Sequence, residues 1–251
     1  MSAHIQSATE AHVTTITIDR PEARNALTPE MYEAMTATLA SASRDPDVRV
    51  VVFAGTGGQF TAGNDIASFA GGLPDDLADS AAFRFAFAIA MFDKPLVAAV
   101  DGYAIGVGAT MLLHVDFVYA TQATVLRFPF VDLGLVPEAG SSLLLPERVG
   151  RLPAAELLLL GEPVDATRAH SLGLVNSVVD GESALDAAMA TAQKLAAKPP
   201  LALQRTRALL RQTDREALRA LMHDEVAAFG EALRGTEAQA VVHAFLTRRS
   251  S

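Results

Sequence analysis

Residues 94–121, KPLVAAVDGYAIGVGATMLLHVDFVYAT, decide the fold. Lys94 and Pro95 lead into the apolar run Leu96 to Val100, which predicts a strand. A loop containing Gly102 follows, and Gly106-Val107-Gly108 then opens an apolar helical run that reaches His114. A strand, a glycine-containing loop and a helix in this order predict one unit of an α/β fold.

The same order occurs upstream. Val48 to Ala54 (VRVVVFA) is rich in Val and Phe, which indicates a strand buried on both faces. It runs into the glycine-rich loop Gly55 to Asp65 (GTGGQFTAGND). An earlier strand is predicted at His12 to Asp19, and Thr28-Pro29 is typical of a helix start. Two further strands are predicted near Val115 to Tyr119 and Thr124 to Phe128.

Helical patterns predominate after Gly150. The break Lys198-Pro199-Pro200 precedes a segment that is helical to the end of the sequence. We therefore predict a core at residues 1–197 and a helical region at residues 198–251. The apolar faces of this region either pack on the core or form a subunit interface, and the pattern leaves both open.

The composition excludes several classes of protein. The 251 residues are 50% hydrophobic and carry 20 Lys and Arg against 29 Asp and Glu, a net charge of −9 that argues against a general nucleic-acid binder. Without cysteine there is no disulfide, thiolate metal site or cysteine nucleophile, and the six histidines show no ligand spacing, so we predict no metal. A secretory signal and a membrane-length apolar run are both missing, so we expect a soluble cytoplasmic protein that does not bind membranes.

Two glycine turns carry the chemistry that the pattern indicates. They are Ala62-Gly63-Asn64-Asp65 and Gly106-Val107-Gly108. A turn between a strand and a helix leaves backbone N–H groups unpaired. Two such turns side by side would present two donors to one oxygen, which is an oxyanion hole. The alternative is that these glycines only make tight connections.

Four blocks in a fixed order resemble the enoyl-CoA hydratase/isomerase superfamily, which has the crotonase fold. They are FTAGNDI at 60–66, the segment 94–121, FPFVDLGLVPEAGSSLLLPERVG at 128–150 and GLVNSVVD at 173–180. The resemblance implies an α/β fold, a crotonase-like spiral of ββα units with a C-terminal helical trimerisation region. It also implies an acyl-coenzyme A thioester as substrate, no separate cofactor, and a homotrimer or a dimer of trimers.

The resemblance also assigns site residues. It implies that the main-chain N–H groups of Asn64 and Val107 form the oxyanion hole. Arg24 and Ala26 match a loop that contacts the nucleotide of coenzyme A. Substrate contacts are further implied at residues in or directly after the two turns and at one aromatic position: Ala62, Gly63, Asp65, Ile66, Gly106 and Phe130.

The number and positions of the catalytic glutamates distinguish the reactions within this family. Its hydratases use two glutamates, at positions that here are Thr110 and Phe130, so a two-acid hydration is not expected. The segment 129–142, PFVDLGLVPEAGSS, most resembles the Δ3,Δ2-enoyl-CoA isomerases of the peroxisomal type, whose single catalytic glutamate maps to Glu138. One carboxylate can take a proton from C2 and return it to C4. Apolar neighbours such as Leu135 and Val136 are expected to raise the pKa of Glu138.

Several alternatives stay open at this level. Asp132 or Thr110 could assist Glu138, although Asp132 is expected in a solvated turn. The chain could catalyse another reaction of an acyl-CoA enolate, such as decarboxylation, thioester hydrolysis or isomerisation of a ring double bond. It could also be an acyl-CoA-binding module without catalysis. The stripe Phe83, Phe87 and Met91 either lines an acyl pocket or packs in the core.

Overall fold

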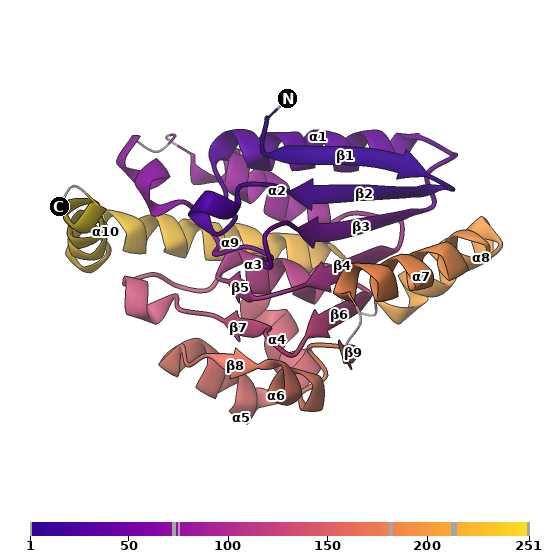
Figure 1. The fold of residues 1–251 in the computed structure, drawn as a ribbon. Coiled ribbons are helices and arrows are strands. Elements are labelled where there is room, and N and C mark those ends of the chain that lie inside the picture. Colours follow the sequence, from indigo (N-terminus) through magenta and orange to yellow (C-terminus); the bar gives the residue numbers. More distant parts are fainter. Residues whose placement is uncertain (1, 72–73, 75, 181–182, 212–214, 250–251) are drawn as a thin grey trace.

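The computed structural model describes residues 2–249 except 72–73, 75, 181–182 and 212–214 (Figure 1). Its larger sheet has the strand order β1-β2-β3-β4-β6-β9, with β1 antiparallel to β2 and the other neighbours parallel. These strands are β1 (Ile5–Glu10), β2 (Val13–Ile18), β3 (Val50–Gly55), β4 (Leu96–Val100), β6 (Phe117–Thr121) and β9 (Ser177–Val179). A smaller sheet pairs β5 (Tyr103–Ile105), β7 (Val125–Arg127) and β8 (Val164–Asp165) in that order.

Helices cover the larger sheet and continue beyond it to the C-terminus (Figure 1). They are α1 (Pro29–Arg44), α2 (Ala81–Ala90), α3 (Val107–Thr110), α4 (Ser141–Val149), α5 (Arg151–Ala155), α6 (Ala166–Ser171), α7 (Ala184–Ala196), α8 (Pro200–Leu210), α9 (Arg215–Arg234) and α10 (Thr236–Arg249). Short 3-10 turns lie at Pro21–Ala23, Ile66–Gly71, Leu77–Asp79, Met111–His114 and Val131–Leu133, and a π-helical turn at Glu156–Leu160. This is the predicted class, a mixed α/β fold with a mostly parallel sheet and a helical C-terminal region.

Strand β3 shows why the larger sheet needs helices on both faces. Val50 and Val52 pack with the small side chains of α7, whereas Val51 and Phe53 belong to the core under α1 and α2. Because successive side chains of a strand point to opposite faces, an uninterrupted apolar strand must be covered twice. The predicted burial of this strand on both faces is therefore confirmed.

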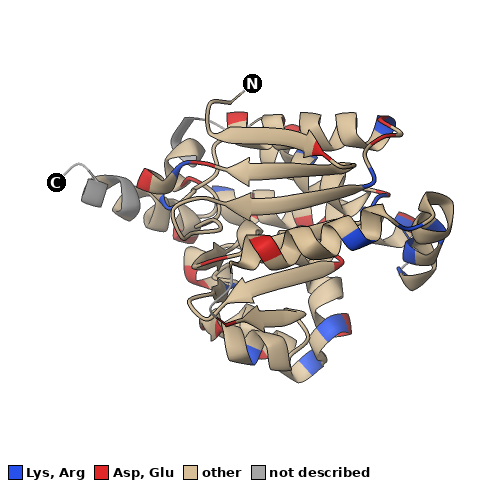
Figure 2. Cartoon of the chain, turned by 45° about the vertical axis from the view of Figure 1, so that its right-hand side comes forward, with Lys and Arg blue, Asp and Glu red and all other residues tan. Residues whose placement is uncertain are grey.

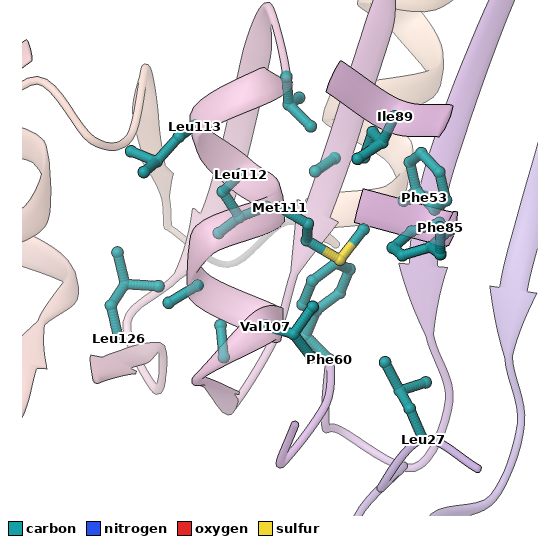
Figure 3. Close-up of a cluster of buried hydrophobic side chains, with 14 of the residues drawn as sticks. Leu27, Phe53, Phe60, Phe85, Ile89, Val107, Met111, Leu112, Leu113 and Leu126 are labelled. Carbon is teal, nitrogen blue, oxygen red and sulfur yellow. The ribbon is translucent and has the colours of Figure 1, made fainter. Parts of the chain in front are cut away.

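The segment after β5 is anchored deep in the core. Figure 3 shows Val107 and Met111 projecting from the helical segment at 107–114 toward the aromatic rings on one side of it. Phe53, Phe60 and Phe85 are all fully buried in this cluster. Close packing of this kind holds the backbone of Val107 in one place relative to the large sheet.

Most elements predicted from the sequence are present. Strand β4 has the predicted bounds, and α1 begins at Pro29 after Thr28, as predicted. The strands predicted near Val115 and Thr124 exist as β6 and β7, but they belong to different sheets. Strand β7 instead pairs with β5 in parallel. The Val125 N–H also donates to the Gly102 carbonyl at 2.9 Å.

The C-terminal helices lie against the predicted core. Helix α9 packs on α2 and on the turn Leu77–Asp79, and α10 packs on the turns at 66–71 and 131–133. Helices α9 and α10 therefore cover part of their own chain, and the role of the C-terminal region in trimerisation stays a prediction.

Charged side chains lie mainly on helices and loops, whereas the central strands β2, β3 and β4 carry none (Figure 2). Lys, Arg, Asp and Glu are interspersed on the face shown in Figure 2 rather than collected into one basic surface. Within the described ranges, no helix combines the length and apolar character needed to cross a membrane.

Candidate active site

A cavity of about 310 Å³ brings together three residues that the sequence analysis singled out, Asn64, Val107 and Glu138. Its walls come from α1, Ser68, Pro74, the residues 77–80, α2 and α9, and include Tyr32, Leu77, Phe83, Phe229 and Leu233. Of the stripe on α2, only Phe83 lines this cavity; Phe87 stacks on His223, with ring centroids 4.7 Å apart. A larger hollow of about 910 Å³ lies along β1, β2 and α1 and contains none of the predicted site residues.

The two glycine turns lie side by side because the chain segments before them are paired. The Thr61 N–H donates to the Tyr103 carbonyl at 2.8 Å, and the Ile105 N–H donates back to the Thr61 carbonyl at 3.1 Å. Gly63 has a φ of +86°, and a Cβ atom there would lie 2.5 Å from the Ile105 carbonyl oxygen. The lack of a side chain at Gly63 is thus what allows the two turns to touch.

Each turn contains a backbone N–H group that has no hydrogen-bond acceptor among the described residues. Val107 is the first residue of α3, where an N–H has no acceptor within the helix. The Leu27 backbone bonds to the carbonyl of Gly63 and the N–H of Asp65, which leaves the N–H of Asn64 between them unused. In the part of the chain that the structure describes, neither N–H finds a protein acceptor, and both residues line the cavity. This arrangement can hold a negatively charged oxygen.

Asn25 fastens the loop 20–26 to the first turn. It is fully buried with a φ of +57°, which Asn tolerates better than most residues. Its Nδ2 donates to the carbonyls of Thr56 at 3.0 Å and Gln59 at 2.7 Å, and its own carbonyl accepts from Thr61 Oγ1 at 2.7 Å. Sequence reasoning missed this residue, because its partners lie more than thirty residues away in the chain.

The remaining predicted substrate contacts lie around the cavity rather than in its lining. Arg24 is exposed, with its guanidinium carbon 6.0 Å from the centroid of the Tyr103 ring. Asp65 pairs with Arg20 at 2.8 Å and accepts from the Ala67 N–H, so it caps the turn at 66–71. Phe130 is buried in the core. The cavity lining does not include these or the other predicted contacts, Ala26, Ala62, Gly63, Ile66 and Gly106, whose roles toward a substrate stay predictions.

Glu138 is the buried carboxylate of the cavity. Its side chain lies in the loop before α4 and is only 5% exposed. Thr110 Oγ1 donates a hydrogen bond of 2.5 Å to Glu138 Oε1. Burial raises the pKa of Glu138 to about 7; the Thr110 hydrogen bond opposes this rise and the charge of Glu225 adds to it. The shift has the direction that the apolar neighbours predicted.

The structure distinguishes Thr110 from Asp132, the two residues that the sequence analysis considered as assisting Glu138. Thr110 is completely buried and contacts the carboxylate directly. Asp132 pairs with Arg127 at 2.9 Å, and both side chains are more than 40% exposed, away from the cavity. Asp132 thus has the solvated position that was expected of it, and Thr110 is the residue beside Glu138.

His114 is a core residue that supports the same loop. Its Nε2 lies 2.8 Å from the Ala139 carbonyl, and burial lowers the pKa of His114 to about 3. The imidazole is therefore neutral at physiological pH and donates this hydrogen bond from Nε2. His114 is therefore a buried core group whose ring nitrogen has a hydrogen-bond partner.

Tyr32 is a cavity residue that the sequence analysis missed. Its hydroxyl donates to Asn64 Oδ1 at 2.5 Å, and burial raises the pKa of Tyr32 well above its usual value. A neutral phenol thus holds the side chain of Asn64, a residue of the cavity lining. No local signal marks Tyr32, since it lies beside the apolar stripe of α1. Over the residues placed by the structure, no three His, Asp or Glu side chains cluster as metal ligands.

Comparison with known proteins gives one consistent family. The sequence model of the family described as enoyl-CoA hydratase/isomerase matches residues 8–251. The chain is 35% identical to enoyl-CoA delta isomerase 2 of Rattus norvegicus over 99% of its own length, and it spans 64% of the length of that protein. It is 34% identical to 2,3-dehydroadipyl-CoA hydratase of Escherichia coli, covering 96% of this chain and 94% of that one. The solved structure of Pseudomonas aeruginosa OdaA is 40% identical with a TM-score of 0.93, covering 97% of this chain and 99% of that one.

Proposed function

Because the chain belongs to the enoyl-CoA hydratase/isomerase family, we propose that it is a Δ3,Δ2-enoyl-CoA isomerase with Glu138 as its acid and base. One observation carries the proposal. Among the described residues that line the cavity, Glu138 is the one buried carboxylate, and it shares this lining with Asn64 and Val107, whose N–H groups we assign as donors. Thr110, which contacts Glu138, matches the position where the resemblance implies a glutamate in the family's hydratases. The name of the rat relative, enoyl-CoA delta isomerase 2, supports the same reaction.

The reaction follows from these groups. The thioester oxygen accepts hydrogen bonds from the N–H groups of Asn64 and Val107, and Glu138 removes a proton from C2. The negative charge of the enolate moves to the thioester oxygen, where each donor lowers the barrier by about 3 kcal/mol. Protonated Glu138 then returns the proton to C4, and the double bond has moved from C3–C4 to C2–C3. With its pKa at about 7, Glu138 can act as base and as acid near neutral pH.

The other carboxylates of the cavity are poor candidates for a second acid. Glu33 and Asp79 line its open side and are exposed, and Glu33 pairs with Arg84 at 3.1 Å. Hydration needs one group to activate water and another to protonate the α-carbon. A single buried carboxylate favours proton transfer between two carbons, although the name of the Escherichia coli relative is that of a hydratase.

The substrate is accordingly an acyl-CoA thioester, and the reaction needs no separate cofactor. We assign Arg24, which is exposed beside Tyr103, to the anionic part of coenzyme A. The net charge of −9 gives no long-range attraction for this anion, so recognition depends on such local cations. We expect the working protein to be a homotrimer or a dimer of trimers.

The test is to incubate the protein with a 3-enoyl-CoA in D₂O and to follow the products by chromatography and mass spectrometry. The 2-enoyl isomer, with little 3-hydroxyacyl-CoA, is expected. Deuterium at C2 without isomerisation would point to another enolate reaction, and hydrated product would establish a hydratase. Bound thioester with neither product nor exchange would favour a binding module.

Glu138→Gln then tests the assigned residue. We expect turnover to fall roughly 10²- to 10⁴-fold while thioester binding stays nearly intact. Glu147→Gln, an exposed glutamate of α4, is the matched control. Full activity in the Glu138 variant would exclude the assignment.

A further inference from the structure

The turn that carries Glu138 has an unusual backbone. We call residues 138–142 the catalytic turn. Ala139 has a φ of +58° and Gly140 a φ of +74°, so two consecutive residues are left-handed before α4 begins at Ser141. Gly140 is the N-cap of α4 and has no side chain that could accept the first N–H groups of the helix.

Glu225 of α9 supplies the missing acceptor. Its carboxylate accepts from the Gly140 N–H at 2.6 Å, from the Ser142 N–H at 3.0 Å and from Ser142 Oγ at 2.5 Å. It is thus a helix cap brought in from a helix that is more than eighty residues away in the sequence. Between Gly140 and Ser142, Ser141 Oγ donates to the Glu138 carbonyl at 2.6 Å, so the same short turn is also tied to the backbone of Glu138.

Apolar side chains of α9 hold the same turn. A Cβ atom on Gly140 would lie 2.7 Å from Leu218 Cδ1 and 3.6 Å from Met222 Cγ, so the helix lies directly against the backbone. Ala139 shares a buried cluster with these two residues. Further along α9, Phe229 and Leu233 form part of the cavity wall. One helix therefore contacts both the catalytic turn and the space where a substrate would lie.

The charges around this turn can be assigned from each element that packs on it. Glu225 is only 7% exposed; burial raises its pKa, but its three donors favour the charged carboxylate. Its negative charge in turn raises the pKa of Glu138. The other groups that face Glu138 or its loop are the hydroxyl of Thr110 from α3, the neutral phenol of Tyr32 from α1 and the neutral imidazole of His114.

We propose that Glu225 is a positioning residue, which acts through Gly140 and Ser142 to hold the Glu138 carboxylate toward the substrate cavity. The C-terminal helical region is then part of the catalytic machinery and not only a covering or assembly element. The expected effect of Glu225 on kcat rests on the proposed isomerase function, whereas its expected effect on the Glu138 pKa does not.

The test compares Glu225→Gln with Glu231→Gln, which makes the same change at an exposed position of α9. For Glu225→Gln we expect kcat to fall roughly 10- to 100-fold, because a misplaced catalytic group loses about this much. KM should stay within about 2-fold, because Glu225 does not line the cavity. The acid limb of the pH profile should move to lower pH, because a like charge is removed. A variant that matches Glu231→Gln in kcat and in the acid limb would overturn the proposal.

Two further variants keep the inference testable if Glu225→Gln does not fold. Glu225→Asp keeps the charge but shortens the reach, so kcat should fall while the acid limb stays in place. Ser142→Ala removes one of the three donors, and a loss of kcat of about 3- to 10-fold is expected, because the two backbone donors still hold the Glu225 carboxylate. Unchanged kcat in both would overturn the proposal.

A direct titration separates this proposal from the proposed function. The carboxyl carbon of Glu138 is followed by NMR in protein labelled with ¹³C-glutamate and is assigned by its absence in Glu138→Gln. A lower Glu138 pKa in Glu225→Gln than in Glu231→Gln is expected even if the wild-type protein does not isomerise a 3-enoyl-CoA. Equal pKa values in the two variants would refute the electrostatic part.

Discussion

Replacing Thr110 with Val isolates the hydrogen bond that tunes the carboxylate of Glu138, the proposed catalytic group. The side chains have nearly the same shape, but Val cannot donate the 2.5 Å bond to Glu138 Oε1. A hydrogen bond to a charged group contributes about 1.5–3 kcal/mol, and one pKa unit corresponds to about 1.36 kcal/mol. Losing the bond destabilises the anion, so the Glu138 pKa should rise by about 1–2 units above its wild-type value of about 7.

The expected result is a loss of activity that higher pH restores. At pH 7 the ionised fraction of Glu138 falls from about half to roughly 1–10%, so kcat/KM should fall about 5- to 50-fold. Near pH 9.5 the variant should return to within a few-fold of wild type. The assay is the pH dependence of 3-enoyl-CoA isomerisation, with Thr110→Ser, which keeps the hydroxyl, as control. An acid limb of Thr110→Val at or below the wild-type pH would refute the reasoning.

The remaining predictions concern stability and the two turns. The pKa of Glu138 is about 7 in the folded protein against 4.5 unfolded, so the folded state holds the extra proton and stability falls as the pH rises between these values. At about 1.36 kcal/mol per pKa unit, this loss of stability is about 3 kcal/mol. Glu138→Gln should therefore unfold at a higher temperature than wild type at pH 8, but not near pH 4. The same difference in unfolding temperature at both pH values would contradict this. Gly63→Ala places a Cβ atom 2.5 Å from the Ile105 carbonyl oxygen and should lower kcat roughly 100-fold by moving the Asn64 N–H. Gly106→Ala meets no atom within 4 Å, so it should mainly lower stability, by about 1–3 kcal/mol for its φ of +55°; a larger kcat loss at 106 than at 63 would reverse this ranking.

The fold was predictable where burial leaves a clear hydrophobic pattern in the sequence. Strand β4 is apolar throughout and is buried at every residue, so its bounds could be stated in advance. Strand β1 was missed because only Ile5 is even half-buried and the other residues are exposed. It exists through its backbone pairing with β2, from Ile5 opposite Ile18 to Glu10 opposite Val13, and such pairing leaves no alternating pattern.

The candidate site was predictable where backbone groups and short motifs define it. Asn64, Val107 and Glu138 lie within recognisable blocks and do meet at one cavity. Tyr32 carries no such mark, because its role depends on a contact with a residue 32 positions further on. Glu225 did leave a signal. It falls at helical spacing within the buried stripe of α9, where an acidic residue demands a partner.

The hydroxyl of Thr110 is consistent with the proposal that Glu138 acts as the single acid and base. A glutamate at this completely buried position would lie within hydrogen-bond reach of Glu138, and two carboxylates so close could not both ionise. They would share a proton and titrate as a pair, with one member held as an acid. Such a pair suits hydration, which needs an acid and a base at once. A neutral hydroxyl instead stabilises the Glu138 anion against burial and leaves its pKa at about 7, so the same group can remove a proton and return it. The residue at position 110 therefore sets the protonation states available to Glu138, and with them the class of reaction that this cavity favours.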